Sequence, residues 1–416
     1  MIQKYCFLLA GVLLLLLSSV AVQAQWVAQI TNTTQNLRSL ELLSATDGWA
    51  TGAGSTLLRT TDAGKTWGSE VTGHPGNYNA IAFGDFAGVN GWIVGDMPFV
   101  LTTDNNGITW STVASSTTST LNSIQFLSTG NLGWAVGNTG TIIGTTDAGA
   151  TWNKEVSGVS TNLYAVVFVG TELTSVGWAV GDNGTILVTT DNGGSWVPKV
   201  IPYQNNLYAM DMVDPNNGWI VGDQIILHTI DGGVTWLKQD FVNPTVLRSI
   251  AILDTATAYA AGIGGRMLKT TDGKTWVDQS TGTANAIYAL QFQISPTIGW
   301  AAGDNGMIIT FGGSSAVAGK PSQPMTSNLM QNFPNPFNPS TTISYYLTEP
   351  SHVSLKIYDQ LGRLVSQLLE CEESAGEHAV VWRSQSSTGD ELLSGVYTCR
   401  LEAGAHSFTR KMVLSK

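Results

Sequence analysis

GWAVGDNGTILVTTDNGGSW, residues 177–196, contains both of the motifs that decide the fold. The first motif, Gly-Trp-x-x-Gly, recurs around Trp49, Trp92, Trp134, Trp178, Trp219 and Trp300, and a degenerate copy, Ala258–Gly262, lies between the last two. The successive spacings are 43, 42, 44, 41, 40 and 41 residues. A constant period of this length is typical of repeat architectures, and it predicts seven units.

A second motif follows each of the first six copies and has the form Ser/Thr-x-Asp-x-Gly-x-Thr-Trp, as in Thr60–Trp67. The Asp side chain accepts hydrogen bonds from backbone N–H groups of a tight turn, Gly permits a positive φ, and Trp packs on its neighbour. When Asp104 is taken as the acid of the second copy, that copy is one residue longer than the others. We therefore predict turn-forming, structural roles for Asp62, Asp104, Asp147, Asp191, Asp231 and Asp272.

Each unit has the same order of apolar strands and turns, and it predicts four short antiparallel strands per repeat, as in a propeller blade. A solenoid is the alternative architecture. The seventh unit lacks the Asp-containing turn, but the segment Gln25–Gln29 resembles Trp276–Gln279, which follows the sixth turn. An N-terminal strand that completes the last blade would remove the exposed sheet edges. We therefore expect an all-β protein with a seven-bladed β-propeller over residues 25–313.

The composition limits the class of protein. With 43% hydrophobic residues, 46 Gly, 14 Trp and only 12% charged residues, the chain is not a disordered one. The net charge of −11 disfavours a nucleic-acid partner, because phosphate binding needs clustered Lys and Arg. The five His residues form no closely spaced pair and no cluster with Cys, and no phosphate loop is present. We expect no metal and no cofactor.

The N-terminus, residues 1–24, has the pattern of a secretory signal peptide. Lys4 supplies the positive charge, Phe7–Leu17 the apolar region and Val22-Gln23-Ala24 the cleavage site. The apolar run is shorter than the roughly 20 residues that span a membrane, so we expect no transmembrane segment after cleavage. Cys371 and Cys399 remain after cleavage and allow one disulfide in an exported domain. The sequence leaves the paired and the free states open.

A linker is expected at residues 314–330, because this stretch is small, polar and Pro-containing. Residues 331–416 then combine Asn332–Ile343, Val353–Asp359, Leu361–Val365, Gly395–Tyr397 and Lys411–Lys416. Alternating apolar strands and Gly turns predict a small Ig-like β-sandwich. These motifs resemble the type A C-terminal sorting domain of type IX secretion cargo. The resemblance implies recognition by the type IX machinery and a location outside a Gram-negative cell, either secreted or on the outer surface, reached through the periplasm.

The repeats themselves resemble the propeller family of photosystem II assembly and stability factors, and also the Asp-box repeats of sialidases and some glycoside hydrolases. The resemblance covers about 290 residues and implies the propeller fold. It does not transfer a function, since one fold hosts many functions. The photosystem-binding role of plant and cyanobacterial members is not expected here, because the sequence has no pigment or thylakoid signature.

One aligned position varies while its surroundings repeat. The second residue of the first strand follows an apolar residue, precedes Ser or Ala, and is Arg38, Asn79, Asn122, Tyr164, Tyr208, Arg248 or Tyr288. In a propeller the first strand lies innermost, so these residues should surround the mouth of the channel. The turns after Gly-Trp-x-x-Gly should open on the same face and add Asp96, Asp182, Asp223 and Asp304. The Asp-containing turns should lie on the opposite face.

The function that this pattern favours is non-catalytic binding of a protein or glycan, because Tyr and Arg offer large contact areas with polar ends. Two other interpretations remain open. The varied position can line the channel without binding anything, and two suitably spaced carboxylates would suffice for an extracellular glycoside hydrolase. No catalytic residue is assigned.

Overall fold

The structure is a computed structural model, and it describes two stretches of the chain. These are residues 26–311 except 85–88, 128–129 and 293–297, and residues 328–415 except 330–331, 333–336, 338–339, 348, 374–375, 386–391 and 405. The expected signal peptide and most of the expected linker lie outside the described residues. The chain divides into two compact units, Met1–Ala316 and Val317–Lys416, and each is described by itself.

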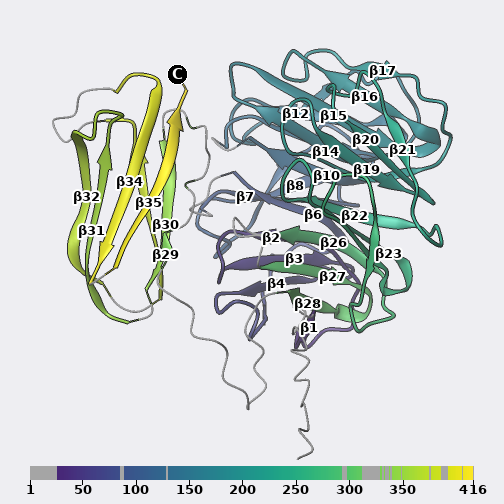
Figure 1. The fold of residues 1–416 in the computed structure, drawn as a ribbon. Helices are drawn as coiled ribbons and strands as arrows, with labels where there is room; N and C mark the ends of the chain where they lie inside the picture. Colours follow the sequence, from purple (N-terminus) through teal and green to yellow (C-terminus); the bar gives the residue numbers. More distant parts are fainter. Residues whose placement is uncertain are drawn as a thin grey trace, which may run out of the picture. The chain divides into compact units, whose positions relative to one another are not determined.

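The first unit consists of four-stranded antiparallel sheets, the blades, in which the strands of blades 1 to 6 follow one another in chain order from the inside outward (Figure 1). Blade 1 consists of β2 (Leu37–Leu42), β3 (Gly48–Gly52), β4 (Leu57–Thr60) and β5 (Gly68–Ser69), and blade 2 of β6 (Tyr78–Phe83), β7 (Gly91–Gly95), β8 (Phe99–Thr103) and β9 (Ser111–Ala114). Blade 3 consists of β10 (Leu121–Phe126), β11 (Gly133–Gly137), β12 (Ile142–Thr145) and β13 (Asn153–Glu155), and blade 4 of β14 (Leu163–Gly170), β15 (Ser175–Gly181), β16 (Ile186–Thr189) and β17 (Val197–Lys199). Blade 5 consists of β18 (Leu207–Met212), β19 (Gly218–Gly222), β20 (Ile225–Thr229) and β21 (Leu237–Gln239), and blade 6 of β22 (Leu247–Ile252), β23 (Ala258–Gly262), β24 (Met267–Thr270) and β25 (Val277–Gln279). Four single-turn 3-10 segments follow second strands, at η1 (Asn138–Gly140), η2 (Asp182–Gly184), η3 (Ile263–Gly265) and η4 (Asp304–Gly306).

Blade 7 is built from both ends of the propeller and confirms the predicted closure. Its inner strands are β26 (Ile287–Phe292), β27 (Gly299–Gly303) and β28 (Ile308–Phe311), and its outer strand is the N-terminal β1 (Val27–Gln29). Strand β1 pairs antiparallel with β28, with Ala28 opposite Ile309. The first strand of every blade contacts the first strands of both neighbours, and β26 contacts β2, which closes the ring. This fold is a seven-bladed β-propeller.

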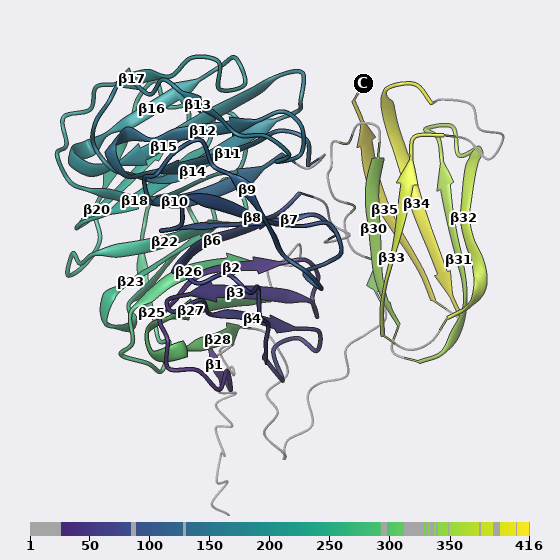
Figure 2. The ribbon, with the colours of Figure 1, turned by 180° about the vertical axis from the view of Figure 1, so that it is seen from behind.

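The core lies between the blades and not within them. The described residues of the propeller form seven buried apolar clusters, and each combines side chains of two neighbouring blades. Trp49 of blade 1, for example, is fully buried against Phe83 and Trp110 of blade 2. At the closure, Trp26 packs with Tyr259 and Phe311 in the cluster of blades 6 and 7. Figure 2 shows the molecule from behind, where the strands of blade 2 (β6–β9) and blade 3 (β10–β13) are labelled. One of the seven clusters combines side chains of these two blades.

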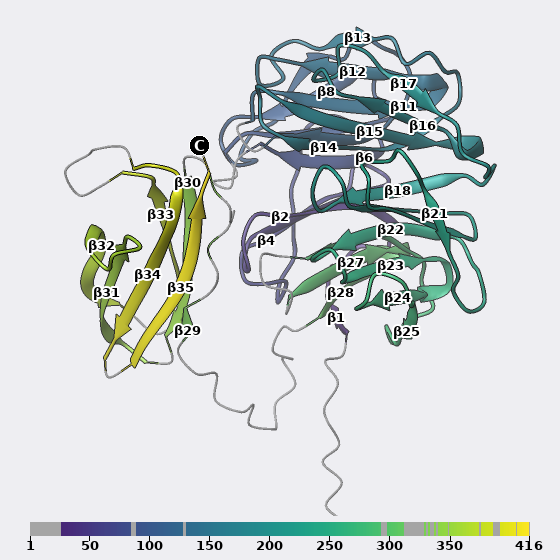
Figure 3. The ribbon, with the colours of Figure 1, turned by 45° about the horizontal axis from the view of Figure 1, so that its top comes forward.

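The second unit has two sheets that share one core, as predicted for a small β-sandwich (Figure 3). One sheet has the order β29 (Asn328–Leu329), β30 (Ser340–Leu347), β33 (Gly376–Arg383), and the other β32 (Leu364–Glu373), β31 (Ser351–Tyr358), β34 (Gly395–Ala403), β35 (His406–Leu414). Buried Phe337 joins the end of the chain to this core, because its N–H donates to the Val413 carbonyl and its ring lies 5.4 Å from Trp382.

The disulfide considered between Cys371 and Cys399 is not formed, and both thiols are free. Cys371 pairs with Val353 and Cys399 with Ile357, so the cysteines lie on opposite sides of strand β31 and four residues apart along it. Two strand spacings of about 4.8 Å already exceed the reach of a disulfide. Burial raises the pKa of the Cys399 thiol to about 12, so it remains protonated.

Half-buried polar side chains on the first strands connect neighbouring blades. Gln291 of blade 7 accepts a hydrogen bond from the Leu42 N–H of blade 1 at 2.9 Å, and Asp211 of blade 5 accepts one from the Ile252 N–H of blade 6 at 3.0 Å. Glu41 is the corresponding residue of blade 1, and burial raises its pKa to about 8, against hydrogen bonds from Gln291 and the Phe83 backbone. Burial also raises the pKa of Asp211, to about 6.

We predict that the propeller loses stability as the pH rises from the ordinary pKa of Glu41, 4.5, to its raised pKa of about 8. The folded state keeps the Glu41 proton up to about pH 8, whereas the unfolded chain releases it near its ordinary pKa of 4.5. In this window the unfolded state binds fewer protons, so the free energy of unfolding falls by about 1.4 kcal/mol per pH unit for one such group. Glu41→Gln, which resembles the neutral acid, should flatten the dependence between pH 7 and 8 in urea titrations.

The matched control is Asp240→Asn, which removes one exposed carboxylate from blade 5. This variant should keep the slope of the wild-type protein. An unchanged slope in Glu41→Gln would show that Glu41 is already ionised in the folded propeller.

Candidate functional site

A β-bulge occurs at the same place in every blade. The pairing of the first strand with the second shifts by one residue after the first residue of the strand, for example between Leu37 and Ser39. The extra residues are the seven that the sequence analysis singled out, here called the ring residues: Arg38, Asn79, Asn122, Tyr164, Tyr208, Arg248 and Tyr288. Because a bulge removes a residue from the ladder and redirects its side chain, the fold presents all seven in the same way.

The last Gly of Gly-Trp-x-x-Gly faces this bulge. A Cβ on Gly95 would lie 1.8 Å from the Asn77 carbonyl oxygen, and one on Gly303 would lie 1.8 Å from that of Ala286. The corresponding distances in the other five blades are 1.9 to 2.2 Å. No side chain fits at such a distance, so the second Gly of the motif is needed for the backbone approach that produces the bulge.

The ring residues of blades 4 to 7 and blade 1 form a continuous aromatic and cationic arc. The Tyr164 and Tyr208 rings lie 5.3 Å apart, and the Arg248 guanidinium lies over the Tyr208 ring at 3.9 Å. Tyr288 follows, where the charges of both Arg248 and Arg38 act on its hydroxyl. The charges of arginines from blades 6 and 1 therefore reach this tyrosine of blade 7.

Amide side chains complete the ring in blades 2 and 3. Arg38 donates a hydrogen bond to Oδ1 of Asn79, and Asn79 in turn donates to the Leu121 carbonyl at 2.9 Å. Asn122 donates to the Leu163 carbonyl of the next blade at 2.8 Å. Through these contacts a ring residue links each neighbouring pair of blades from blade 1 to blade 6. Arg38 is exposed and the other six are half-buried, so the ring is open to a ligand.

The four acids expected near the ring lie at this end of the blades. The hydroxyl of Tyr164 is hydrogen-bonded to Asp182 and that of Tyr288 to Asp304; burial first, and then these carboxylates, raise the pKa of both tyrosines. Asp96 accepts hydrogen bonds from the N–H and the amide of Asn77, both at 2.7 Å. Asp223 is held through its backbone N–H, which donates to the carbonyl of Asn206. The acids therefore position the residues of the ring and the loops beside it.

The turns of the second motif lie at the opposite ends of the strands, where they contact the hairpin between the first and second strands of the same blade. Asp62 accepts hydrogen bonds from Thr60 Oγ1, the Thr66 N–H and Thr66 Oγ1 at 2.7 to 2.9 Å. Asp147, Asp191, Asp231 and Asp272 make the same kinds of bond. These contacts agree with the predicted structural role.

Asp104 does not take this role, and the prediction for blade 2 is wrong. Oδ1 of Asn105 accepts hydrogen bonds from Thr103 Oγ1 and the Thr109 N–H, both at 2.9 Å. The Asn105 amide donates to Thr109 Oγ1 at 2.7 Å. Blade 2 therefore has a motif of normal length in which Asn replaces Asp. Counting back five residues from Trp110, as in the other full-length copies, would have identified Asn105 from the sequence.

The carboxyl groups with raised pKa are held in contacts between blades, and they are not ring residues. Glu155 is an example that the sequence analysis did not single out. Burial raises its pKa to about 7, and it accepts the indole N–H of Trp196 at 2.7 Å. Gln239, the corresponding residue of blade 5, accepts the indole N–H of Trp276 at 2.7 Å. Because the neutral amide of Gln239 accepts the same indole hydrogen bond in blade 5, we assign the Glu155 carboxyl a structural role.

Within the described ranges, no group of three or more His, Cys, Asp or Glu side chains is arranged to hold a metal ion. The same residues contain no helix that is long and apolar enough to cross a membrane.

Comparison with known proteins identifies the family. The sequence profile described as photosynthesis system II assembly factor YCF48 matches residues 18–121, 117–188 and 171–246, which together span more than half of the 416 residues. The chain belongs to the YCF48 family. The profile of the FlgD Ig-like domain matches residues 337–407, in the second unit. No curated protein matches the chain.

Solved structures agree with the YCF48 propeller fold. "YCF48 bound to D1 peptide" is 22% identical, covers 70% of this chain and 97% of its own, and has a TM-score of 0.58. "YCF48 from Cyanidioschyzon merolae" is 20% identical, covers 69% and 98%, and has a TM-score of 0.57. The WD40 repeats of RRP9 reach a TM-score of 0.59 at 9% identity, covering 70% and 98%. At these identities the likeness concerns the fold.

We predict that Asn105→Ala destabilises the propeller and that Asp104→Ala does not. The first change removes the acceptor of two hydrogen bonds in a tight turn, which should cost about 1–3 kcal/mol of unfolding free energy. The second removes an exposed side chain at the neighbouring position. Chemical denaturation of both variants measures the difference, and equal stabilities would contradict the assignment of Asn105.

Proposed function

We propose that the protein binds a peptide segment of a partner protein through the ring residues. The observation that carries the proposal is the row of Tyr164, Tyr208 and Arg248, in which the tyrosine rings lie 5.3 Å apart and Arg248 stacks on Tyr208 at 3.9 Å. The family adds support, since a YCF48 structure has been solved with a D1 peptide bound. The D1 peptide is the ligand of that YCF48 structure, and we propose no photosystem protein as the partner of the present chain.

The chemistry of the ring suits a polypeptide. Two guanidinium groups offer paired donors for carbonyl or carboxylate oxygens, and tyrosine rings offer flat apolar area with a polar end. Because Tyr164 and Tyr288 are bonded to Asp182 and Asp304, their rings are held in place before a ligand arrives. Such preorganisation lowers the entropic cost of binding. The asparagines of blades 2 and 3 add amide groups at the other side of the ring.

We predict that Arg38→Ala combined with Arg248→Ala weakens binding at least tenfold on a peptide array, or removes a partner captured by the wild-type propeller. The matched control is Lys65→Ala combined with Lys274→Ala, which removes the same charge from exposed residues of the turns at the opposite ends of the blades. Binding that both double variants retain would contradict the proposal. A glycan array and a polysaccharide panel test the two alternative functions. Glycan binding at the ring would favour a lectin, and polysaccharide turnover would favour a hydrolase.

We further propose that the second unit is a type IX sorting domain and that the protein reaches the outer surface or the medium after signal cleavage. The proposal rests on the sequence motifs of residues 331–416. Two of their residues have structural roles in the unit: Asn332 donates to Thr341 Oγ1 at 2.9 Å, and the Phe337 N–H donates to the Val413 carbonyl of the last strand. Most of Phe333–Pro339, the most distinctive part of the motif, lies outside the described residues.

We predict that deleting residues 331–416 leaves the propeller in the periplasm of a host with type IX secretion. The same segment fused to a periplasmic reporter should move the reporter to the surface or the medium. Fractionation and immunoblotting measure both results. Export of the truncated chain, or retention of the fusion, would contradict the sorting role.

A further inference from the structure

Neighbouring blades are held together by a repeated contact on their outer halves. The turn of the second motif lies on the Trp of the preceding blade, so closely that a Cβ on Gly107 would lie 2.3 Å from the Trp49 ring. The corresponding distance is 2.2 Å for Gly149 and Trp92. At the closure, blades 7 and 1 are joined by the Trp that follows the turn of blade 1, because the Trp67 and Trp300 rings lie 5.2 Å apart.

Donors on the outer strands hold these turns by their backbone carbonyls. Arg59, on the third strand of blade 1, donates to the Asn106 carbonyl in the turn of blade 2 at 3.2 Å. Gln239, on the fourth strand of blade 5, donates to the Gly273 carbonyl in the turn of blade 6 at 2.6 Å. A cation on the third strand and an amide at the end of the fourth strand are thus two ways to bind the next turn.

Among the described residues, the junction of blades 6 and 7 has the donors but not the turn. Blade 7 supplies Trp26 in place of the motif's Trp, while its third strand ends at Phe311 and its outer strand starts at Val27. Lys269 corresponds to Arg59, because each lies opposite the aromatic residue of its second strand. Gln279 corresponds to Gln239 as the last residue of its outer strand.

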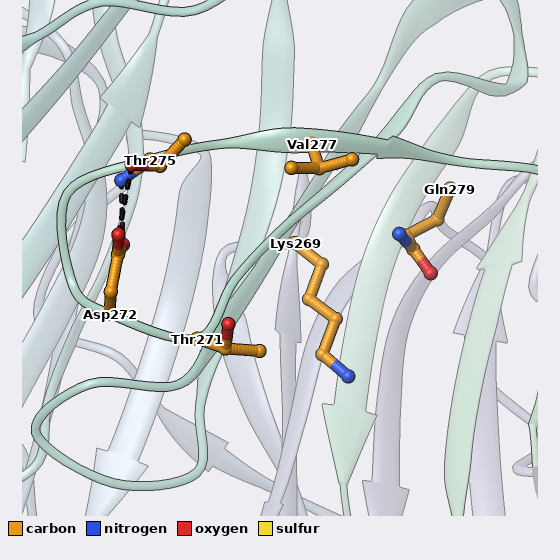
Figure 4. A pocket seen from close by; sticks show the side chains of 6 residues that line it. All are labelled: Lys269, Thr271, Asp272, Thr275, Val277 and Gln279. Carbon is orange, nitrogen blue, oxygen red and sulfur yellow. Dashed lines mark hydrogen bonds between the residues drawn. The ribbon is translucent and has the colours of Figure 1, made fainter.

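A hollow of about 350 Å³ lies at these donors, and we call it the seam hollow. It is lined by Lys269, Thr271, Asp272, Thr275, Val277 and Gln279 (Figure 4). The Lys269 ammonium lies 5.1 Å above the Tyr259 ring, and the Gln279 amide donates only to the carbonyl of its neighbour Asp278, at 3.1 Å, among the described residues. Both side chains are half-buried, and both have donors left for a ligand.

We propose that the seam hollow binds an acidic tight turn of a partner polypeptide. The turn's backbone carbonyls accept hydrogen bonds from Lys269 Nζ and Gln279 Nε2, as the turns of blades 2 and 6 do from Arg59 and Gln239. The ammonium favours an acidic residue in the turn. The turn needs no Trp of its own, because Trp26 is already buried in the core between blades 6 and 7. The bound turn would occupy the outside of this junction, and this site is separate from the ring residues.

The test uses the full chain and a labelled cyclic peptide with the sequence of Thr145–Thr151, which contains the turn with one acidic residue and no cationic side chain, and which ends before Trp152. Fluorescence anisotropy should show saturable binding in the micromolar to millimolar range. Lys269→Ala combined with Gln279→Ala should weaken it at least fivefold, whereas Lys154→Ala combined with Gln204→Ala, which removes one exposed lysine and one exposed glutamine from other blades, should leave it unchanged. No saturable binding, or equal binding by the seam variant, would overturn the proposal.

Thermal unfolding without peptide tests whether a segment of the chain itself fills the hollow. Arg59→Ala combined with Gln239→Ala breaks two filled junctions and should lower the melting temperature by several degrees. Lys269→Ala combined with Gln279→Ala should leave it within about one degree, because no described residue places a turn in the hollow. A drop of equal size in both double variants would mean that the chain fills the hollow, and would overturn the proposal.

Discussion

A buried tryptophan packed against the turn of the next blade is the contact on which the propeller depends. Each blade is too thin to have a core of its own, so its apolar side chains become buried only when a neighbour covers them. The Gly of the following turn is what allows the backbone to approach the indole ring. Because every blade needs a neighbour on both sides, the arrangement is stable only as a closed ring, and β1 and Trp26 provide the closure.

The same repeats that build the core also separate structure from recognition. The Gly-Trp-x-x-Gly motif uses its Trp for packing between blades and its second Gly for the bulge at the other end of the strand. The bulge residue takes no part in the strand ladder, so it is free to vary without disturbing the core. This explains how Arg38, Asn79 and Tyr164 occupy equivalent backbone positions.

Closure with an N-terminal strand has a local consequence. A propeller built from seven full repeats would have seven turns of the second motif, but the junction of blades 6 and 7 joins the two ends of the domain and has Trp26 without a turn. Lys269 and Gln279 therefore keep donors that their counterparts use inside the fold. The outer surface therefore departs from the repeated pattern at the junction of blades 6 and 7, where blade 7 is built from both ends of the domain.

The sequence by itself determined the number of blades, the closing strand, the sandwich and the seven varied positions, because a spacing near 42 residues and period-two strands are local patterns; that these positions are bulges came from the strand register. It misassigned Asp104, where two acceptor side chains adjoin and only the turn's hydrogen bonds distinguish them. It left the Cys371 and Cys399 pairing open, because strand order is a long-range property. Only the tertiary structure decided that Arg248 stacks on Tyr208, that burial raises the pKa of Glu41, and that the described residues place no turn at Lys269 and Gln279, since these depend on which surfaces cover one another.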